Sequence, residues 1–201
     1  MRANRLLPLS GIAAVVLILA SFAVVGEPPD TDAPVDEIVS YYTDHDSDLV
    51  ASGTVLAYGA LLFLIFATAV SGAVRRAQRD SGAASAVGFG GGVLFTTGLL
   101  IFAGISYALG DVPDKLDPSS VQTLNLLNED LFFPAAIGLV AFLLGTGAGV
   151  LKTGILPAWL GWVAIAIAVV GLTPAGFFAL PLFGLWIIVT SVMLSMRAAT
   201  E

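Results

Sequence analysis

The stretch that decides the fold is LVASGTVLAYGALLFLIFATAVSGAV, residues Leu49–Val74, which is followed at once by RRAQRD, residues Arg75–Asp80. The apolar run contains no ionisable Asp, Glu, Lys, Arg or His. About 20 apolar residues suffice for a helix to cross a hydrocarbon core of about 30 Å. Lys and Arg are enriched in loops that stay on the cytoplasmic side of a membrane. The stretch therefore predicts a transmembrane helix whose arginine-rich end faces the cytoplasm.

Five further apolar runs extend this pattern over the chain. Of the 201 residues, 57% are hydrophobic and 11% charged, whereas soluble domains carry about 25% charged residues. We expect an all-α membrane protein with six transmembrane helices: Leu6–Val25, Leu49–Val74, Ala83–Leu109, Leu131–Val150, Leu156–Leu172 and Phe177–Met196. Because these runs and their connections use nearly the whole chain, residues 1–201 are expected to form a single transmembrane domain.

Charged residues are segregated between the two sets of connections. Seven of the eight Lys and Arg residues fall on one side, with Lys115 as the exception: Arg2, Arg5, Arg75, Arg76, Arg79, Lys152 and Arg197. Thirteen of the fifteen Asp and Glu residues fall on the other. The pattern predicts cytoplasmic N- and C-termini and acidic outer loops in a multi-pass protein of the cytoplasmic membrane. A uniformly acidic surface would argue against nucleic acid as a partner, but the net charge of −7 is segregated by side and the cytoplasmic loops are mildly basic. We expect the lipid bilayer as the partner and no nucleic acid.

The first apolar run, Leu6–Val25, has two readings. A basic start followed by an apolar run is also typical of a cleaved signal peptide. This run is longer than the usual signal core of about 7–15 residues, and Ser21 with Ala23 makes a poor cleavage pair. We therefore expect an uncleaved helix. The chain has no Cys, which excludes disulfides, thiolate nucleophiles and Cys-ligated zinc.

Each long outer loop is expected to contain a short amphipathic helix. In the first loop, Pro34 suits a first helical turn, and four residues follow at helical spacing: Val35, Ile38, Val39 and Tyr42. In the second loop, Asp117 suits an N-cap and Pro118 the first helical position. An apolar face is expected to follow there, made of Val121, Leu124, Leu127 and Leu131.

Small residues recur every four positions in three of the runs. They are Gly53 and Ala57, then Ala84, Gly88 and Gly92, then Ala141, Gly145 and Gly149. Helices in lipid associate where such stripes let their backbones approach closely. We expect packing within one bundle, and a seam between copies in a homo-oligomer is the alternative.

The candidate polar cluster begins with Asn125, Asn128, Glu129 and Asp130. Pro134 has no N–H to donate to the Asp130 carbonyl, so a kink is expected there. Two carboxylates and a freed carbonyl at the outer membrane boundary could hold a cation or a polar solute. A solvated helix entrance is the simpler reading.

The single histidine, His45, completes the candidate polar cluster and lies in the segment Asp44–Asp48. The alternating carboxylates of this segment resemble the start of a calcium-binding loop. However, Leu49 stands where the turn glycine is required, and the distal Glu is missing. One His among carboxylates holds a divalent cation only weakly. We expect an interfacial His and assign no metal site.

The centres of the six runs contain no ionisable residue. Their hydroxyl groups are expected to return hydrogen bonds to their own helices: Thr54, Thr68, Thr96, Thr97, Thr190 and Ser191. Proton- and ion-coupled carriers usually show buried ionisable groups. The sequence contains no His-Glu metalloprotease pair, no Ser-Lys or Ser-His-Asp set and no carboxylate dyad in the membrane. We therefore predict no catalytic residue and no cofactor.

Several strings in the second half resemble a known family. They are LNLLNEDLFF at Leu124–Phe133, GILPAWLGW at Gly154–Trp162 and TPAGF at Thr173–Phe177, with Trp186 in the last run. From about Leu124 onward the chain resembles a bacterial family of six-helix integral membrane proteins of unknown function. The Leu-Pro-x-Trp-Leu-Gly-Trp string at 156–162 is the most specific part. The resemblance implies the six-helix fold and supplies no catalytic residues.

Three functions remain open. The first is a non-enzymatic protein that acts by helix packing or by contact with a membrane-protein partner through its acidic outer loops. The second is a small channel or facilitator for a neutral or weakly cationic solute, with Glu129 and Asp130 on its path. The third is a membrane enzyme on lipid-like substrates, with its site near His45 and Glu129. We favour the first, because structured acidic outer segments accompany runs that lack deep ionisable residues.

Overall fold

The computed structural model describes residues 6–26, 28–30, 32–79, 81–111, 115–173, 176 and 179–197, without the side chain of Phe132. Every regular element in these ranges is helical, so the expected all-α fold is confirmed. In chain order the helices are η1 (Leu7–Leu9), α1 (Ser10–Val25), α2 (Val35–Asp44), α3 (Asp46–Ala77), α4 (Ala83–Asp111), α5 (Pro118–Asp130), α6 (Phe132–Thr153), α7 (Ala158–Gly171) and α8 (Ala179–Arg197).

Five helical stretches are long and apolar enough to cross a membrane: Leu7–Val25, Asp46–Ala77, Ala83–Asp111, Pro118–Thr153 and Ala179–Arg197. The sixth apolar helix, α7, has 14 residues and a length of about 21 Å, which is less than the hydrocarbon thickness of about 30 Å. It begins at Ala158, two residues after the expected start, because Gly154 ends α6 in a left-handed conformation and Pro157 caps α7.

Helix α3 extends beyond the expected span at both ends. It has 32 residues and is about 48 Å long, so it is longer than a membrane core is thick. Its first turn carries Asp46 and Asp48, and its last turn carries Arg75 and Arg76. These charges complement the partial charges of the two helix ends. The polar residues that the sequence assigned to loops therefore belong to the helix.

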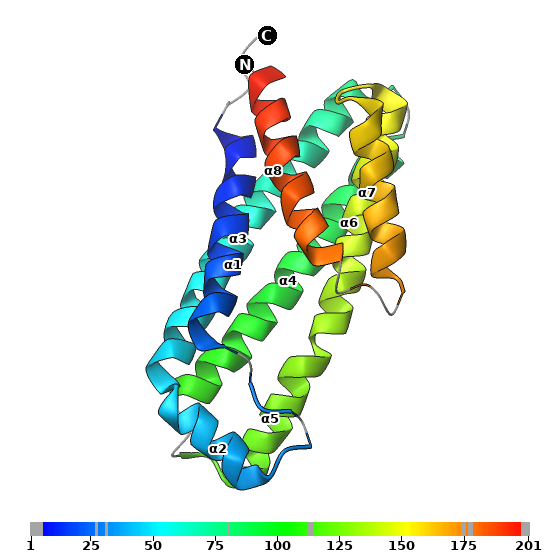
Figure 1. Ribbon diagram of the computed structural model, residues 1–201. Helices are drawn as coiled ribbons and strands as arrows, with labels where there is room; N and C mark the ends of the chain where they lie inside the picture. The colour runs from blue at the N-terminus through cyan, green and yellow to red at the C-terminus, as the bar shows by residue number, and fades with distance from the viewer. Residues whose placement is uncertain are drawn as a thin grey trace.

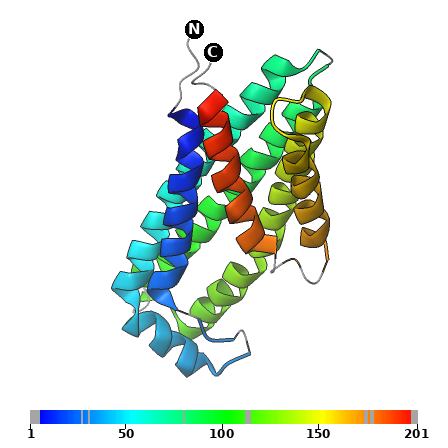
Figure 2. The same cartoon turned by 45° about the horizontal axis from the view of Figure 1, so that its top comes forward.

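The basic helix ends lie together. Figures 1 and 2 show the start of α1, the end of α8 and the α3–α4 and α6–α7 connections at one end of the bundle, whereas α2 and α5 cover the other. The Arg197 guanidinium donates to the Gly154 carbonyl oxygen at 3.4 Å, which joins α8 to the α6–α7 connection. The last turns of α3, α6 and α8 carry the basic residues Arg75, Arg76, Lys152 and Arg197. The charge segregation seen in the sequence is thus present in the fold.

The glycine stripes lie inside the bundle. A Cβ atom added to Gly145 of α6 would lie 2.7 Å from the Cα atom of Gly88 on α4. A Cβ atom on Gly92 would lie 2.7 Å from the Cβ atom of Ala67 on α3. No side chain fits at these crossings, so the stripes serve close packing of helices within one chain. An interface between two copies of the chain would have to use a different surface of the bundle.

The centre of the bundle is filled by aromatic rings from four helices. The ring of Phe63 on α3 lies edge-on to those of Phe95 on α4, Phe142 on α6 and Phe183 on α8. The centroid distances are 4.9, 5.3 and 5.9 Å. The ring of Phe142 also meets that of Trp186 at 6.1 Å. Edge-to-face contacts at these distances stabilise the packing, so the bundle is solid at this level.

Candidate functional site

Helices α2 and α5, which we call the cap, pack against each other over one end of the bundle (Figure 1). Their buried faces bring Ile38 and Tyr42 of α2 together with Val121 of α5, above Leu49 of α3 and Leu109 of α4. This cluster is separate from the main core between the long helices. Both expected amphipathic helices are therefore confirmed, and they form one small folded unit.

The apolar face of α5 differs from the expected one. Val121 is fully buried and Leu124 packs partly on the cap cluster. Leu127 was expected on the same face but is 44% exposed. Asn125 is buried in its place, because the buried stripe of α5 faces α2 as well as the long helices.

A buried hydrogen bond joins the two cap helices. The Tyr42 hydroxyl donates to Asn125 Oδ1 at 2.5 Å, and Asn125 Nδ2 lies 3.5 Å from the Pro29 carbonyl oxygen. Tyr42 is 1% exposed and Asn125 4%. Burial raises the pKa of Tyr42, and the neighbouring Tyr41 adds to the rise, so the Tyr42 hydroxyl stays a neutral donor. The bond ties the first outer loop to the second.

Sequence reasoning placed Asn125 in a solute-binding cluster and missed its pairing with Tyr42. The signal was present in the spacing, because Asn125 lies four residues after Val121 and therefore on the same side of the helix. A polar residue on an apolar stripe indicates a buried partner as well as a binding site.

His45 lies at the junction of α2 and α3. Its ring stacks on that of Tyr41, with centroids 4.6 Å apart, and its Nδ1 lies 2.9 Å from the Tyr41 carbonyl oxygen. The Tyr41 hydroxyl in turn donates to the Val25 carbonyl oxygen at 3.0 Å. His45 is half-buried and helps to hold α2 against the end of α1 through Tyr41. An interfacial position for His45 stays a prediction.

The other members of the candidate polar cluster do not gather into one site. Asn128 is half-buried, and its buried Oδ1 has no hydrogen-bond partner. Glu129 and Asp130 are exposed. Among the residues that the structure describes, no hydrogen bond or ion pair joins His45 to these three, and no group of three potential metal ligands occurs. The cluster is thus divided between the inside of the cap and its surface.

The disturbance expected where Pro134 leaves the Asp130 carbonyl without a donor is found at the next residue, Leu131. Helix α5 ends at Asp130 and α6 begins at Phe132, so the chain is interrupted at Leu131. The N–H of Leu131 still donates to the Leu127 carbonyl oxygen at 3.0 Å. The N–H of Ala135 donates to the Leu131 carbonyl oxygen at 3.4 Å. Leu131 keeps right-handed helical dihedral angles, φ −66° and ψ −16°, so α5 continues into α6 through one irregular turn.

Asp117 begins α5 as the sequence predicts. Its carboxylate accepts hydrogen bonds from the backbone N–H groups of Ser119 and Ser120, at 3.0 and 3.2 Å, and from both hydroxyl groups. Pro118 occupies the first helical turn. The serine side chains contribute most to lowering the pKa of Asp117 to about 2. The Asp117 carboxylate that caps α5 therefore stays charged at neutral pH.

The hydroxyl groups of the long helices fall into two classes. Thr54, Thr68, Thr96 and Thr97 donate to carbonyl oxygens four residues earlier, at 2.8 to 2.9 Å, as expected. Thr190 and Ser191 of α8 do not, and their buried oxygens have no partner. The expectation for these two residues was wrong. Ser191 faces Gly11 of α1, where the two helices approach closely.

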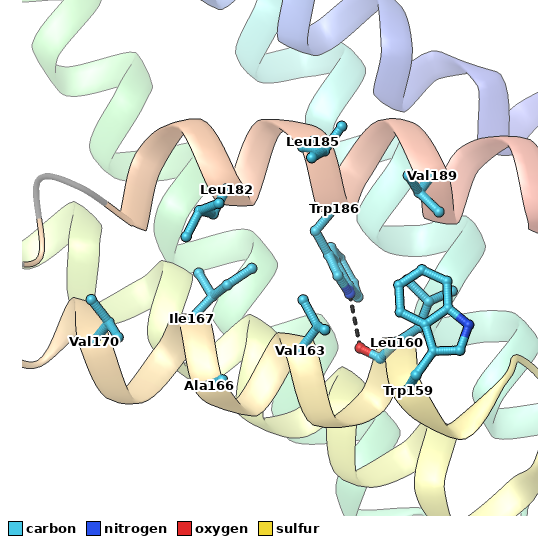
Figure 3. Close-up of a pocket in the computed structure, with 10 residues that line it drawn as sticks. All are labelled: Trp159, Leu160, Val163, Ala166, Ile167, Val170, Leu182, Leu185, Trp186 and Val189. Carbon is cyan, nitrogen blue, oxygen red and sulfur yellow. Dashed lines mark hydrogen bonds between the residues drawn. The ribbon is translucent and has the colours of Figure 1, made fainter.

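An apolar groove of about 330 Å³ separates α7 from α8. Figure 3 shows Trp159 at one end and Val170 with Leu182 near the other. Trp186 Nε1 donates to the Leu160 carbonyl oxygen at 3.0 Å across the groove, and this bond links the two helices (Figure 3). The lining offers hydrocarbon contacts and no reactive group: Trp159, Leu160, Val163, Ala166, Ile167, Val170, Leu182, Leu185, Trp186 and Val189.

Comparison with known proteins adds no function to this geometry. No protein-family model, no curated protein and no solved structure matches the chain. The tight turn expected at Thr173–Gly176 contains Pro174 and Ala175, which lie outside the described residues. Arg2 and Arg5, two of the basic residues used for the orientation, lie outside them as well.

Proposed function

We propose that this chain is a non-enzymatic, six-helix protein of the cytoplasmic membrane that holds a folded acidic cap outside the membrane for a protein partner. In this arrangement α7 is the sixth, shortest span, and both termini are cytoplasmic. The chain is grouped with the bacterial six-helix family through its Leu-Pro-x-Trp-Leu-Gly-Trp string. No catalytic residue or cofactor is assigned.

The observation that carries the proposal is the Tyr42–Asn125 hydrogen bond. A loop that merely connects two membrane helices has no need of a buried polar bond to another loop. Here the bond and the apolar cluster beneath it fix a surface on which Asp36, Glu37, Glu129 and Asp130 are exposed. Such a surface favours a partner with a basic face, since complementary charge directs association.

The packing also favours this function over a channel. A pore requires a continuous polar path through the bundle, whereas the rings of Phe63, Phe95 and Phe142 meet at its centre. Glu129 and Asp130 lie on the exposed surface of the cap region. These features support a solid scaffold with a binding surface at one end.

The orientation is tested with single cysteines, because the native chain has none. Ser81→Cys and Thr123→Cys both place a thiol at an exposed position, at opposite ends of the bundle. A membrane-impermeant maleimide added to intact spheroplasts is expected to label the cysteine at position 123 only. The cysteine at position 81 should react only after the membrane is opened. Labelling of both from the same side would overturn the proposed topology.

The partner surface is tested by photo-cross-linking in cells. A photoreactive residue at Thr43, which is exposed on the cap, is expected to give a discrete adduct. Replacing Glu37 and Glu129 with Gln should weaken that adduct. The same probe at Leu61, which is 52% exposed on the side of α3, is the control and should give none. Equal adducts at both positions would contradict a cap-specific partner.

A flux assay separates this proposal from a channel. Liposomes that contain the purified chain are expected to release small solutes no faster than protein-free liposomes. If they do release a solute, and Glu129→Gln with Asp130→Asn abolishes that release, the channel function replaces the one proposed here.

A further inference from the structure

A second pocket lies at the basic end of the bundle, far from the cap. It has a volume of about 340 Å³ between the end of α3 and the start of α4. Its lining is rich in hydroxyl groups and includes one cation: Thr68, Ser71, Gly72, Arg75, Ser81, Gly82, Ser85, Ala86 and Phe89. No carboxylate lines it among the described residues, although the sequence places Asp80 in the same connection.

Ser71 supplies a buried hydroxyl that has no partner. Its side chain is 5% exposed, and its Oγ makes no hydrogen bond. Thr68 lies one turn earlier in α3 and also lines the pocket. Its hydroxyl donates to the Leu64 carbonyl oxygen at 2.8 Å, which is the usual hydrogen bond of a Ser or Thr side chain within a helix. An unpaired buried hydroxyl is costly, so a ligand that accepts its hydrogen bond would be stabilised there.

Arg75 lies directly over the start of α4. A Cβ atom on Gly82 would lie 2.8 Å from Cζ, Nε and Nη1 of Arg75, so the guanidinium packs directly against the Gly82 backbone. Gly82 also has φ +75°, which a glycine adopts without strain. The first N–H groups of a helix have no acceptor within the helix and attract anions. The Arg75 guanidinium and the Ser71 hydroxyl therefore line one pocket, which also contains Ser81 and Gly82 at the start of α4.

This set of groups fits an oxyanion. Each of the three kinds of group can donate a hydrogen bond, and Arg and helix N-termini both favour phosphate. The Ser85 hydroxyl donates to the Gly82 carbonyl oxygen at 2.8 Å and keeps the helix start in place. The pocket thus combines one positive charge with donors that are already positioned.

The depth of the pocket favours a phosphate that belongs to a lipid. Thr68 precedes Arg75 by seven residues, which is about 10 Å along α3. At that depth Phe89 of α4 is 42% exposed and offers an apolar surface. Arg75, Ser81 and Gly82 line the pocket at the helix ends, and Ala86 and Phe89 add apolar surface further along α4, which suits the headgroup and the first part of an acyl chain of a phospholipid. We propose that it binds the phosphodiester headgroup of an anionic phospholipid, with an acyl chain along Phe89.

The test measures lipid binding to the purified full-length chain in detergent by native mass spectrometry. The probes are phosphatidylglycerol, phosphatidylcholine and inorganic phosphate. Arg75→Gln is expected to weaken phosphatidylglycerol binding about tenfold, because it removes a charge-assisted contact. Arg79→Gln is the matched control. It makes the same charge change at an exposed arginine that does not line the pocket, and it should leave binding within about threefold.

Ser71→Ala gives a second, independent measurement. It removes only the unpaired hydroxyl, so the unfolding temperature without lipid should stay the same or rise, which shows that the variant folds. Its affinity for phosphatidylglycerol should fall about threefold to tenfold. If millimolar inorganic phosphate displaces the lipid, the pocket binds an oxyanion but its ligand is a free anion, and the lipid proposal is overturned. Equal losses for Arg75→Gln and Arg79→Gln, or unchanged binding by Ser71→Ala, would overturn the proposal.

Discussion

Replacing Tyr42 with Phe removes the one hydroxyl that joins the two cap helices. Asn125 Oδ1 then loses a donor at 2.5 Å, and at 4% exposure the side chain has little access to water. Asn125 Nδ2 donates to the Pro29 carbonyl oxygen at 3.5 Å, and a bond made by this donor cannot satisfy the acceptor Oδ1. A buried polar group left unpaired costs about 1–3 kcal/mol. We expect Tyr42→Phe to destabilise the cap by about 2 kcal/mol, which is about 30-fold in its opening equilibrium.

Hydrogen exchange followed by mass spectrometry measures this opening locally. Peptides that cover α5 should exchange about 30-fold faster in Tyr42→Phe, because α5 separates from α2 without unfolding the bundle. Peptides around Phe63, in the main core, should keep their protection. Tyr58→Phe is the matched control, since Tyr58 is 60% exposed and its change should affect neither region.

A double variant separates the hydrogen bond from the shape of the ring. Asn125→Leu removes the group that Tyr42→Phe leaves unpaired, and it keeps a similar volume. Combined with Tyr42→Phe it should restore part of the α5 protection, which a double-mutant cycle expresses as a coupling between the two positions. Wild-type protection of α5 in Tyr42→Phe would refute the reasoning. Faster exchange spread evenly over all helices would refute it as well.

The remaining predictions concern the bundle and the start of α5. Gly91→Ala should destabilise the fold by about 1–3 kcal/mol in thermal unfolding, because the new Cβ meets the α6 backbone; Gly90→Ala, whose Cβ meets nothing within 4 Å, should not. Phe63→Ala should cost about 3–5 kcal/mol in the same measurement, whereas the outward-facing Leu61→Ala should cost little. The pKa of Asp117 is lowered to about 2, so its stabilising effect is present above about 3.8 and is lost as the pH falls through about 2. Asp117→Asn, which keeps a capping side chain, should remove this pH dependence from the exchange of the first turn of α5.

Local chemistry accounts for the elements that the sequence predicts well. The start of α5 follows from Asp117-Pro118, and the end of α6 follows from Gly154, because capping depends on a few neighbouring residues. The length of α3 was underestimated because charged residues were assigned to loops. The irregular turn at Leu131 lies next to the Asp130 carbonyl, where the missing N–H of Pro134 predicts it. Six crossings and their orientation stay predictions, since the structure shows five long apolar helices and the shorter α7.

Contacts between distant residues account for what the sequence did not show. Asn125 is buried because Tyr42, 83 residues earlier, lies against it. Ser191 has no hydrogen-bond partner, and it lies where Gly11, at the other end of the chain, lets α1 approach α8. Neither arrangement leaves a periodic signal within one segment. The sequence therefore locates the polar cluster. It does not show that Asn125 makes a buried structural hydrogen bond while Glu129 and Asp130 are exposed.

The separation of Tyr42 and Asn125 along the chain also sets an order for biosynthesis. Ribosomes add about 5–20 residues each second, so about 4 to 17 seconds pass between the synthesis of these two residues. During that interval α2 is made but α5 is not, so Tyr42 has no hydrogen-bond partner and Ile38 lacks the cover of Val121. The buried face of α2 therefore stays open to other proteins in the cell until the later helix arrives.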